Sequence, residues 1–136
     1  MKKITIIGFF LFSFCVANAQ TIESGSHIAT GYIKPDGTIE NSSHITVGYI
    51  KSDGTIRNKS HSTIGYIKND GTIENSSHIT VGYVKKDGTV ESNSHSIIGY
   101  IRDNGPVESN SHITIGYAKG IKKEWAAVLY FFFKFD

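Results

Sequence analysis

The chain has 136 residues, of which 14 are Lys or Arg, 12 are Asp or Glu and one is a cysteine. Its formal net charge of +2 falls to zero when Lys2 and Lys3 are left out, so no basic stripe exists to neutralise phosphates. These numbers argue against nucleic acid and against an anionic membrane surface as partners.

The first element is a predicted secretory signal peptide over residues 1–19. Two lysines precede the apolar stretch Ile4–Val16, which is too short to span a bilayer, and Ala17–Ala19 matches the small-x-small cleavage pattern. We expect cleavage after Ala19 and an exported mature chain, in the periplasm, at the cell surface or secreted, with no transmembrane span. Cys15 lies in the removed segment, so no disulfide can form.

A 17-residue repeat dominates residues 20–120, the predicted β-hairpin repeat domain. A histidine recurs at this step as His27, His44, His61, His78, His95 and His112. A tyrosine preceded by glycine recurs as Tyr32, Tyr49, Tyr66, Tyr83, Tyr100 and Tyr117. Such regularity predicts one supersecondary unit copied in tandem.

Each unit reads as a long strand, a tight turn and a short strand. The segment "HITVGYIK" from His44 is rich in β-branched residues, and its alternation places Tyr49 on one face and His44 and Gly48 on the other. A turn and a short strand follow each long strand. In the first copy these are "KPDG" and "GTIEN", with Gly37 at the position that needs a left-handed backbone. The chain is therefore predicted to be all-β, with five such hairpins.

The two ends complement each other. Residues 20–27 form a short strand without a long one before it, and residues 112–118 form a long strand without a short one after it. Pairing of these halves would close a flower-like ring with no exposed edge, whereas an open stack would need capping ends. Five-fold closure, six-fold closure and the open stack all remain possible at this point.

Residues 121–136 form a predicted hydrophobic plug of the same domain. Trp125 to Phe133 is an unbroken apolar run, which is typical of either a buried strand or a helix that is apolar on all sides. Periodicity does not separate these two, and a short helix is one of them. We expect the run to fill the hairpin array; a membrane or partner contact and an outer-membrane barrel strand are the alternatives.

The "GYIKSDGTI" repeats, followed by "IGYAKGIKKEWAAVLYFFF" behind a signal peptide, resemble the five-fold beta-flower proteins. This resemblance covers the whole mature chain and implies small exported bacterial proteins built from tandem β-hairpins arranged like petals. It implies no catalytic residue, cofactor or substrate.

The six histidines are candidate metal ligands, because neutral imidazole is a common ligand. No carboxylate or cysteine is expected beside them, so the alternative is a turn histidine that bonds a neighbouring carbonyl. Ser43 and His44 point to opposite faces of a strand, which is unsuitable for a nucleophile and its base. No single asymmetric constellation is visible, and we expect no enzyme and no cofactor.

The six tyrosines are the candidate ligand-binding residues. Regularly spaced aromatic rings can form a platform for sugars, but packing in the core, opposite the glycine, is the interpretation we favour for them. The sequence thus predicts a non-enzymatic structural or binding module outside the cytoplasm. Carbohydrate binding by the tyrosines and metal binding by the histidines are the alternatives, with a cell-surface glycan or another exported protein as partner.

Overall fold

The computed structural model describes residues 19–136, and the predicted signal peptide lies outside them except for Ala19. These residues contain twelve β-strands and two short helices. The strands are β1 (Gln20–Ser24), β2 (Ala29–Ile33), β3 (Thr38–Asn41), β4 (Thr46–Ile50), β5 (Thr55–Asn58), β6 (Thr63–Ile67), β7 (Thr72–Asn75), β8 (Thr80–Val84), β9 (Thr89–Ser92), β10 (Ile97–Ile101), β11 (Pro106–Ser109) and β12 (Thr114–Tyr117). The helices are α1 (Lys123–Ala127) and η2 (Val128–Phe132).

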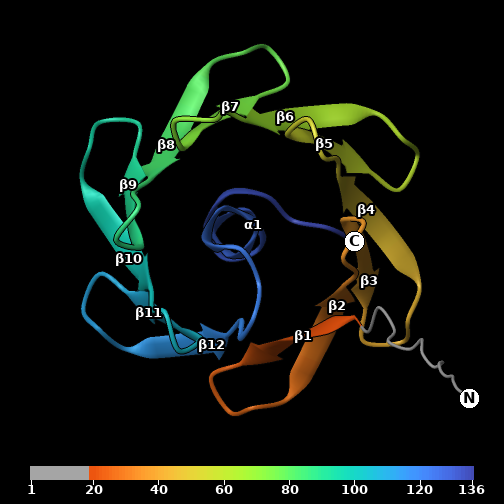
Figure 1. The fold of residues 1–136 in the computed structure, drawn as a ribbon, viewed down its shortest axis with the longest axis horizontal. Helices are drawn as coiled ribbons and strands as arrows, with labels where there is room; N and C mark the ends of the chain where they lie inside the picture. The colour runs from red at the N-terminus through yellow and green to blue at the C-terminus, as the bar shows by residue number, and fades with distance from the viewer. Residues whose placement is uncertain (1–18) are drawn as a thin grey trace, which may run out of the picture.

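The strands form one closed antiparallel barrel. Each strand pairs with its neighbours in the chain, and β1 pairs with β12, so Glu23 lies opposite Tyr117 and Ser24 opposite Gly116. Figure 1 shows the resulting ring. The prediction of an all-β array of tandem hairpins is confirmed, and its closed form is the correct one. Closure leaves no edge strand to pair with another chain.

Six hairpins project outward from the ring like petals (Figure 1). They are β1–β2, β3–β4, β5–β6, β7–β8, β9–β10 and β11–β12. Each petal turns at a Ser-His loop, whereas the Asp-Gly or Asn-Gly turns join one petal to the next. The five predicted hairpins are thus the five links between six petals, and the pairing of β1 with β12 supplies the sixth junction, which closes the ring.

The inside of the barrel is lined by the same positions of every unit. Each short strand contributes one buried β-branched residue: Ile22, Ile39, Ile56, Ile73, Val90 and Val107. On β4, Gly48 and Ile50 are buried and Tyr49 is only half-buried, which confirms that glycine and tyrosine occupy opposite faces. Burying one such aliphatic side chain contributes about 2 kcal/mol.

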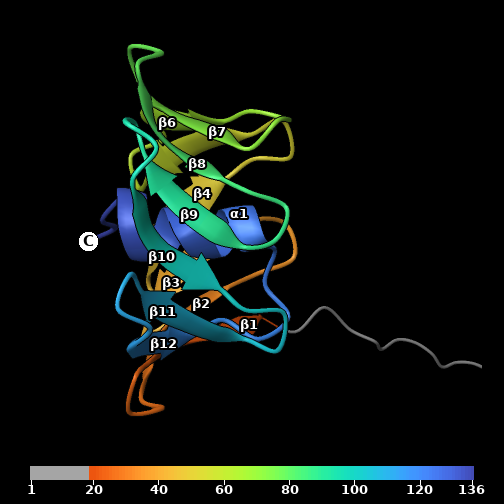
Figure 2. The ribbon, with the colours of Figure 1, turned by 90° about the vertical axis from the view of Figure 1, so that its left-hand side faces the viewer.

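The C-terminal segment fills the barrel as a helix. Figures 1 and 2 show α1 inside the ring with the strands around it. Ala126, Ala127 and Val128 are fully buried, so the predicted plug is confirmed and its helical form is the correct one. Two alanines in succession keep the helix narrow enough for the space that the Ile and Val side chains leave.

The aromatic end of the plug packs against the glycines of the repeat. The contacts pair Tyr130 with Gly116, Phe131 with Gly99, Phe132 with Gly82, Phe133 with Gly65 and Phe135 with Gly48. Successive rings therefore meet successive units, which lie about 60° apart in a ring of six. An α-helix turns about 100° per residue, and the wider π-helix η2 turns less, so its residues match this spacing better.

Candidate functional site

The outer wall of the barrel carries six stacked pairs of aromatic rings. The tyrosine of each unit lies flat against the histidine of the next unit. Ring centroids are 4.2 Å apart in Tyr32–His44, 4.5 Å in Tyr49–His61, 4.2 Å in Tyr66–His78, 4.3 Å in Tyr83–His95, 4.6 Å in Tyr100–His112 and 3.8 Å in Tyr117–His27. The stacks join neighbouring petals, and the last one joins the two ends of the chain.

The backbone conformation at the petal tip explains why a histidine stands there. His44 has φ of 62°, and its backbone N–H donates to the carbonyl of Asn41 at 3.0 Å. The Asn41 side chain accepts from the N–H groups of Ser43 and Ile45 at 2.9 and 3.0 Å. Histidine is among the residues enriched in this left-handed region, so it closes the turn and also supplies a ring. The expected turn histidine is therefore present, but the strand predicted to begin at His44 is wrong. β4 begins at Thr46, and the His44 ring lies on the outer face against Tyr32 and does not share the face of the buried Gly48.

A carboxylate accompanies the histidine in five of the six units, contrary to the expectation of none. In the second petal, His44 Nδ1 lies 3.1 Å from Glu40 Oε1, and Glu40 lies opposite Tyr32 in the strand register. The equivalent acids are Glu23, Glu74, Glu91 and Glu108. Arg57 takes the place of the acid in the remaining unit. The pairing was missed because histidine and acid are separated by a turn, which brings them to the same face.

A basic residue completes the set in two units. Lys34 lies 3.1 Å from the second carboxylate oxygen of Glu40, and the hydrogen bond from His44 and then the one from Lys34 lower the pKa of Glu40 below its usual 4.5. Arg102 donates to Glu108 at 2.9 Å and lies 4.8 Å from the centre of the Tyr100 ring. Its hydrogen bond likewise lowers the pKa of Glu108. These carboxylates are therefore ionised at neutral pH.

The tyrosines and histidines differ in what they offer to solvent. The six tyrosine rings are half-buried on the outer face and lie outside the buried core, so the favoured interpretation of core packing is wrong. Each ring has one face covered by imidazole, and the histidines are the exposed partners, with 63% of the His44 side chain accessible. A flat ligand would thus meet imidazole together with the edge of tyrosine. Exposed isoleucines, Ile28, Ile45, Ile79 and Ile113, follow four of the histidines.

Each set offers two donors to a metal ion, one imidazole and one carboxylate. A protein site for zinc normally has three or four protein ligands. Within residues 19–136 no group of three or more His, Cys, Asp or Glu is placed to hold a metal ion. In this same part of the chain, the hydrogen bonds of the histidine rings go to glutamates and to Arg102, and none goes to a serine hydroxyl.

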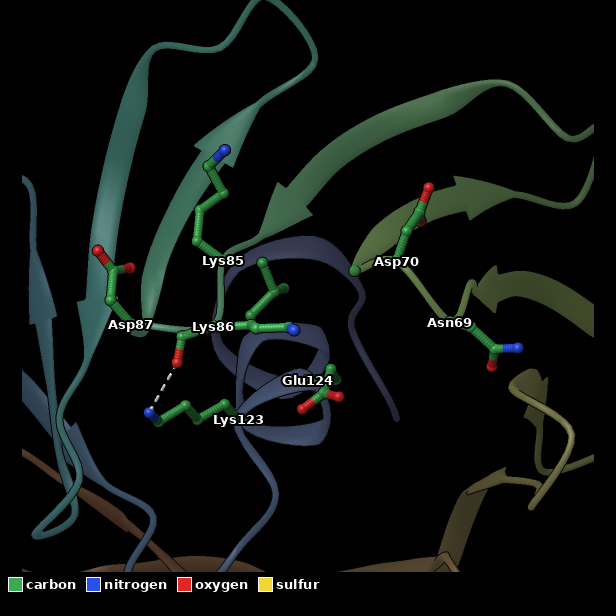
Figure 3. A pocket seen from close by; sticks show the side chains of 9 residues that line it. Asn69, Asp70, Lys85, Lys86, Asp87, Lys123 and Glu124 are labelled. Carbon is green, nitrogen blue, oxygen red and sulfur yellow. Dashed lines mark hydrogen bonds between the residues drawn. The ribbon is translucent and has the colours of Figure 1, made fainter.

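A hollow lies at the end of the barrel where the Asp-Gly turns are. It has a volume of about 670 Å³ and is lined by acidic and basic residues of two turns and of α1 (Figure 3). Lys123 Nζ donates to the carbonyl of Lys86 at 3.1 Å and forms an ion pair with Asp103 at 2.6 Å. The amino group of Lys123 therefore connects the start of the plug to two of the turns. Lys123 lies outside the repeat, so the repeat pattern could not indicate this contact.

The fold and the outer wall together define a closed β-hairpin repeat barrel with a helical plug. A family model described as 5-fold beta-flower protein matches residues 19–134, and the chain belongs to this family. No curated protein and no solved structure matches it. None of the helices in residues 19–136 is long and apolar enough to cross a membrane.

Proposed function

We propose that this protein is an exported, non-enzymatic binding module that attaches to a repetitive glycan outside the cytoplasm. The observation that supports this most directly is the equivalence of the six Tyr–His stacks around one rigid ring. Several weak, identical contacts on one scaffold give avidity when the partner itself is repetitive. A polysaccharide is such a partner.

The chemistry of each petal supports a sugar as ligand. Every petal presents a flat, exposed imidazole. In the second petal the ammonium group of Lys34 lies close to the imidazole of His44, and both pair with the largely buried carboxylate of Glu40. Aromatic faces pack against the apolar C–H face of a sugar ring, and charged groups form the stronger hydrogen bonds with its hydroxyls. Because Tyr32 supports the imidazole from below, the ring is held in place before a ligand arrives.

The test varies the number of intact petals. One variant, His44→Asn, removes a single imidazole. A second variant combines His44→Asn with His78→Asn and His112→Asn and removes three. Asparagine is chosen because it tolerates the left-handed turn. Binding to polysaccharides on a glycan array should weaken only slightly with one change and by about 100-fold with three, because avidity depends on the number of sites. A short oligosaccharide that reaches one petal serves as the monovalent control and should respond little.

Two results would contradict the proposal. One is a folded triple variant that binds polysaccharide as tightly as the native protein. The other is native protein that binds no glycan on the array, which would leave an exported protein as the partner to test. Export itself is tested by N-terminal sequencing of protein made in a bacterium: we expect a chain that begins at Gln20 outside the cytoplasm.

A further inference from the structure

One of the six units lacks the aromatic ring that covers its glycine. A methyl group added to Gly82 would lie 2.5 Å from Cζ of Phe132, and one added to Gly65 would lie at the same distance from Cζ of Phe133. At Gly31 the nearest side-chain atom is Cδ1 of Ile22, 3.7 Å away. The five ring contacts run from Tyr130 to Phe135, and the described residues place none at the sixth position.

A cavity of about 260 Å³ lies at this position. Its walls include Ile22, Gly31, Ile39, Val47, Leu129 and Phe133. Lys134, Phe135 and Asp136 also line it, so a charged border adjoins an apolar floor. The apolar walls are of the same kind as those around the five occupied positions, where each ring rests on a glycine beside an Ile or Val.

The unit around the cavity also departs from the repeat in sequence. The residue before the glycine is Val47, Ile64, Val81, Ile98 or Ile115 in the other units. In this unit it is Thr30, which lines the cavity and donates its hydroxyl hydrogen to the carbonyl of Ile22 at 3.2 Å. The residue before that is Ala29, where the others have Thr or Ile. Smaller and more polar side chains therefore surround the one glycine that no ring covers.

We propose that this cavity is a binding site for a small molecule that carries one phenyl- or phenol-type ring. The ring would lie against Gly31 between Ile22 and Ile39, as the plug's own rings lie against the other five glycines. Tyr130 shows how a phenol is accommodated, since its hydroxyl hydrogen bonds to the strand carbonyl of Glu23 at 2.6 Å. The corresponding carbonyl here belongs to Glu40, which is as close to Gly31 as that of Glu23 is to Gly116. This site lies inside the ring and is separate from the proposed glycan contacts on the petals.

The experiment uses 4-methylphenol as probe and 4-methylcyclohexanol as a puckered comparator of similar size. In the purified protein with labelled methyl groups, 4-methylphenol should shift the NMR signals of Ile22, Ile39 and Val47 in a saturable way. The comparator should shift them much less, because a puckered ring does not lie flat on a glycine. Equal shifts with both compounds, or none with 4-methylphenol, overturn the proposal.

Variants locate the site. Thr30→Phe should cover the cavity and weaken binding at least about tenfold, since the new ring competes for the same space. The matched control, Ile64→Phe, changes the same position in a unit whose glycine already has its ring, and binding should persist. Phe132→Ala should expose Gly82 and add a second saturable site, seen as new shifts of Ile73. Unchanged binding in folded Thr30→Phe, or no second site in folded Phe132→Ala, would show that the glycine position does not define the ligand.

Discussion

The imidazole of His27 stacks on the phenol ring of Tyr117 with 3.8 Å between the ring centroids. This contact crosses the seam where the first and last strands of the barrel meet. On the inner side of the same seam, the Tyr130 hydroxyl lies 2.6 Å from the carbonyl of Glu23 and 2.9 Å from that of Tyr117. The plug therefore reinforces the junction between β1 and β12, which are otherwise joined by a short ladder of paired residues.

Replacement of Tyr130 by phenylalanine should weaken this seam. Burial raises the pKa of Tyr130 to about 12, so at neutral pH its hydroxyl is a donor, and the variant loses that donor while keeping the ring. We expect the free energy of unfolding in urea to fall by about 1 kcal/mol. Amide exchange should increase first in β1 and β12. Uniformly faster exchange over all twelve strands would contradict a special role at the seam.

A series at His78 separates the turn from the stack. His78→Gly keeps a residue that accepts φ of 63° but removes the ring from Tyr66, which should cost about 1 kcal/mol. His78→Ala removes the same ring and adds the strain of a left-handed alanine, about 1 kcal/mol more. Urea unfolding of the two variants measures the difference. If alanine and glycine are equally stable there, the backbone explanation for the histidine is wrong.

Alanine at the repeat glycine tests the contact between plug and wall. Gly82→Ala should destabilise the protein by about 3 kcal/mol, because the new methyl group meets both Phe132 and the carbonyl of Glu91. Gly31→Ala is the matched comparison, since it meets the carbonyl of Glu40 but no aromatic ring. It should be the milder change in thermal denaturation. The reverse order would mean that the rings do not fit against the glycines as described.

The Glu40 pair should make stability depend on acid pH. Folding lowers the pKa of Glu40 from 4.5, first through His44 and then through Lys34, so folding favours the ionised carboxylate. Its contribution is present above that ordinary pKa and is lost as the pH falls through the lowered value. Between about pH 5 and pH 3, the unfolding free energy of Glu40→Gln should therefore fall less steeply than that of the native protein. Glu124→Gln, at an exposed site on α1, is the control and should keep the native slope.

Removal of residues 121–136 should abolish the folded barrel. The shortened chain would expose the ring of Ile and Val side chains that the plug covers, including fully buried Ile56 and Ile73. We expect it to lose the cooperative melting transition and to aggregate in gel filtration. Removal of residues 1–19 alone should leave the transition intact. A shortened, monomeric chain that still melts cooperatively would show that the barrel does not need its plug.

The repeat explains how much could be predicted before the structure was known. Alternation around Gly48 and Tyr49, and the glycine that closes each Asp-Gly turn, are encoded within a few residues, so the strands and links follow from local chemistry. The apolar run that begins at Trp125 similarly had to be buried away from water. For the histidine, the turn was one interpretation and the strand from His44 was the other, and only the turn is correct. Its carboxylate partner Glu40 was not foreseen, because the turn geometry determines which side chains meet across it.

The amino-acid sequence by itself determined the all-β repeat, its seventeen-residue step and the need to bury the C-terminal aromatic segment. Only the tertiary structure decided that the ring has six petals, that Tyr32 stacks on His44, and that the rings from Tyr130 to Phe135 cover five glycines but not Gly31. The physical reason is the distance along the chain over which each feature is determined. Turns and strand alternation depend on residues that are near in the sequence, whereas contacts between repeat units depend on the angle between those units. That angle is set only when the first and last strands pair.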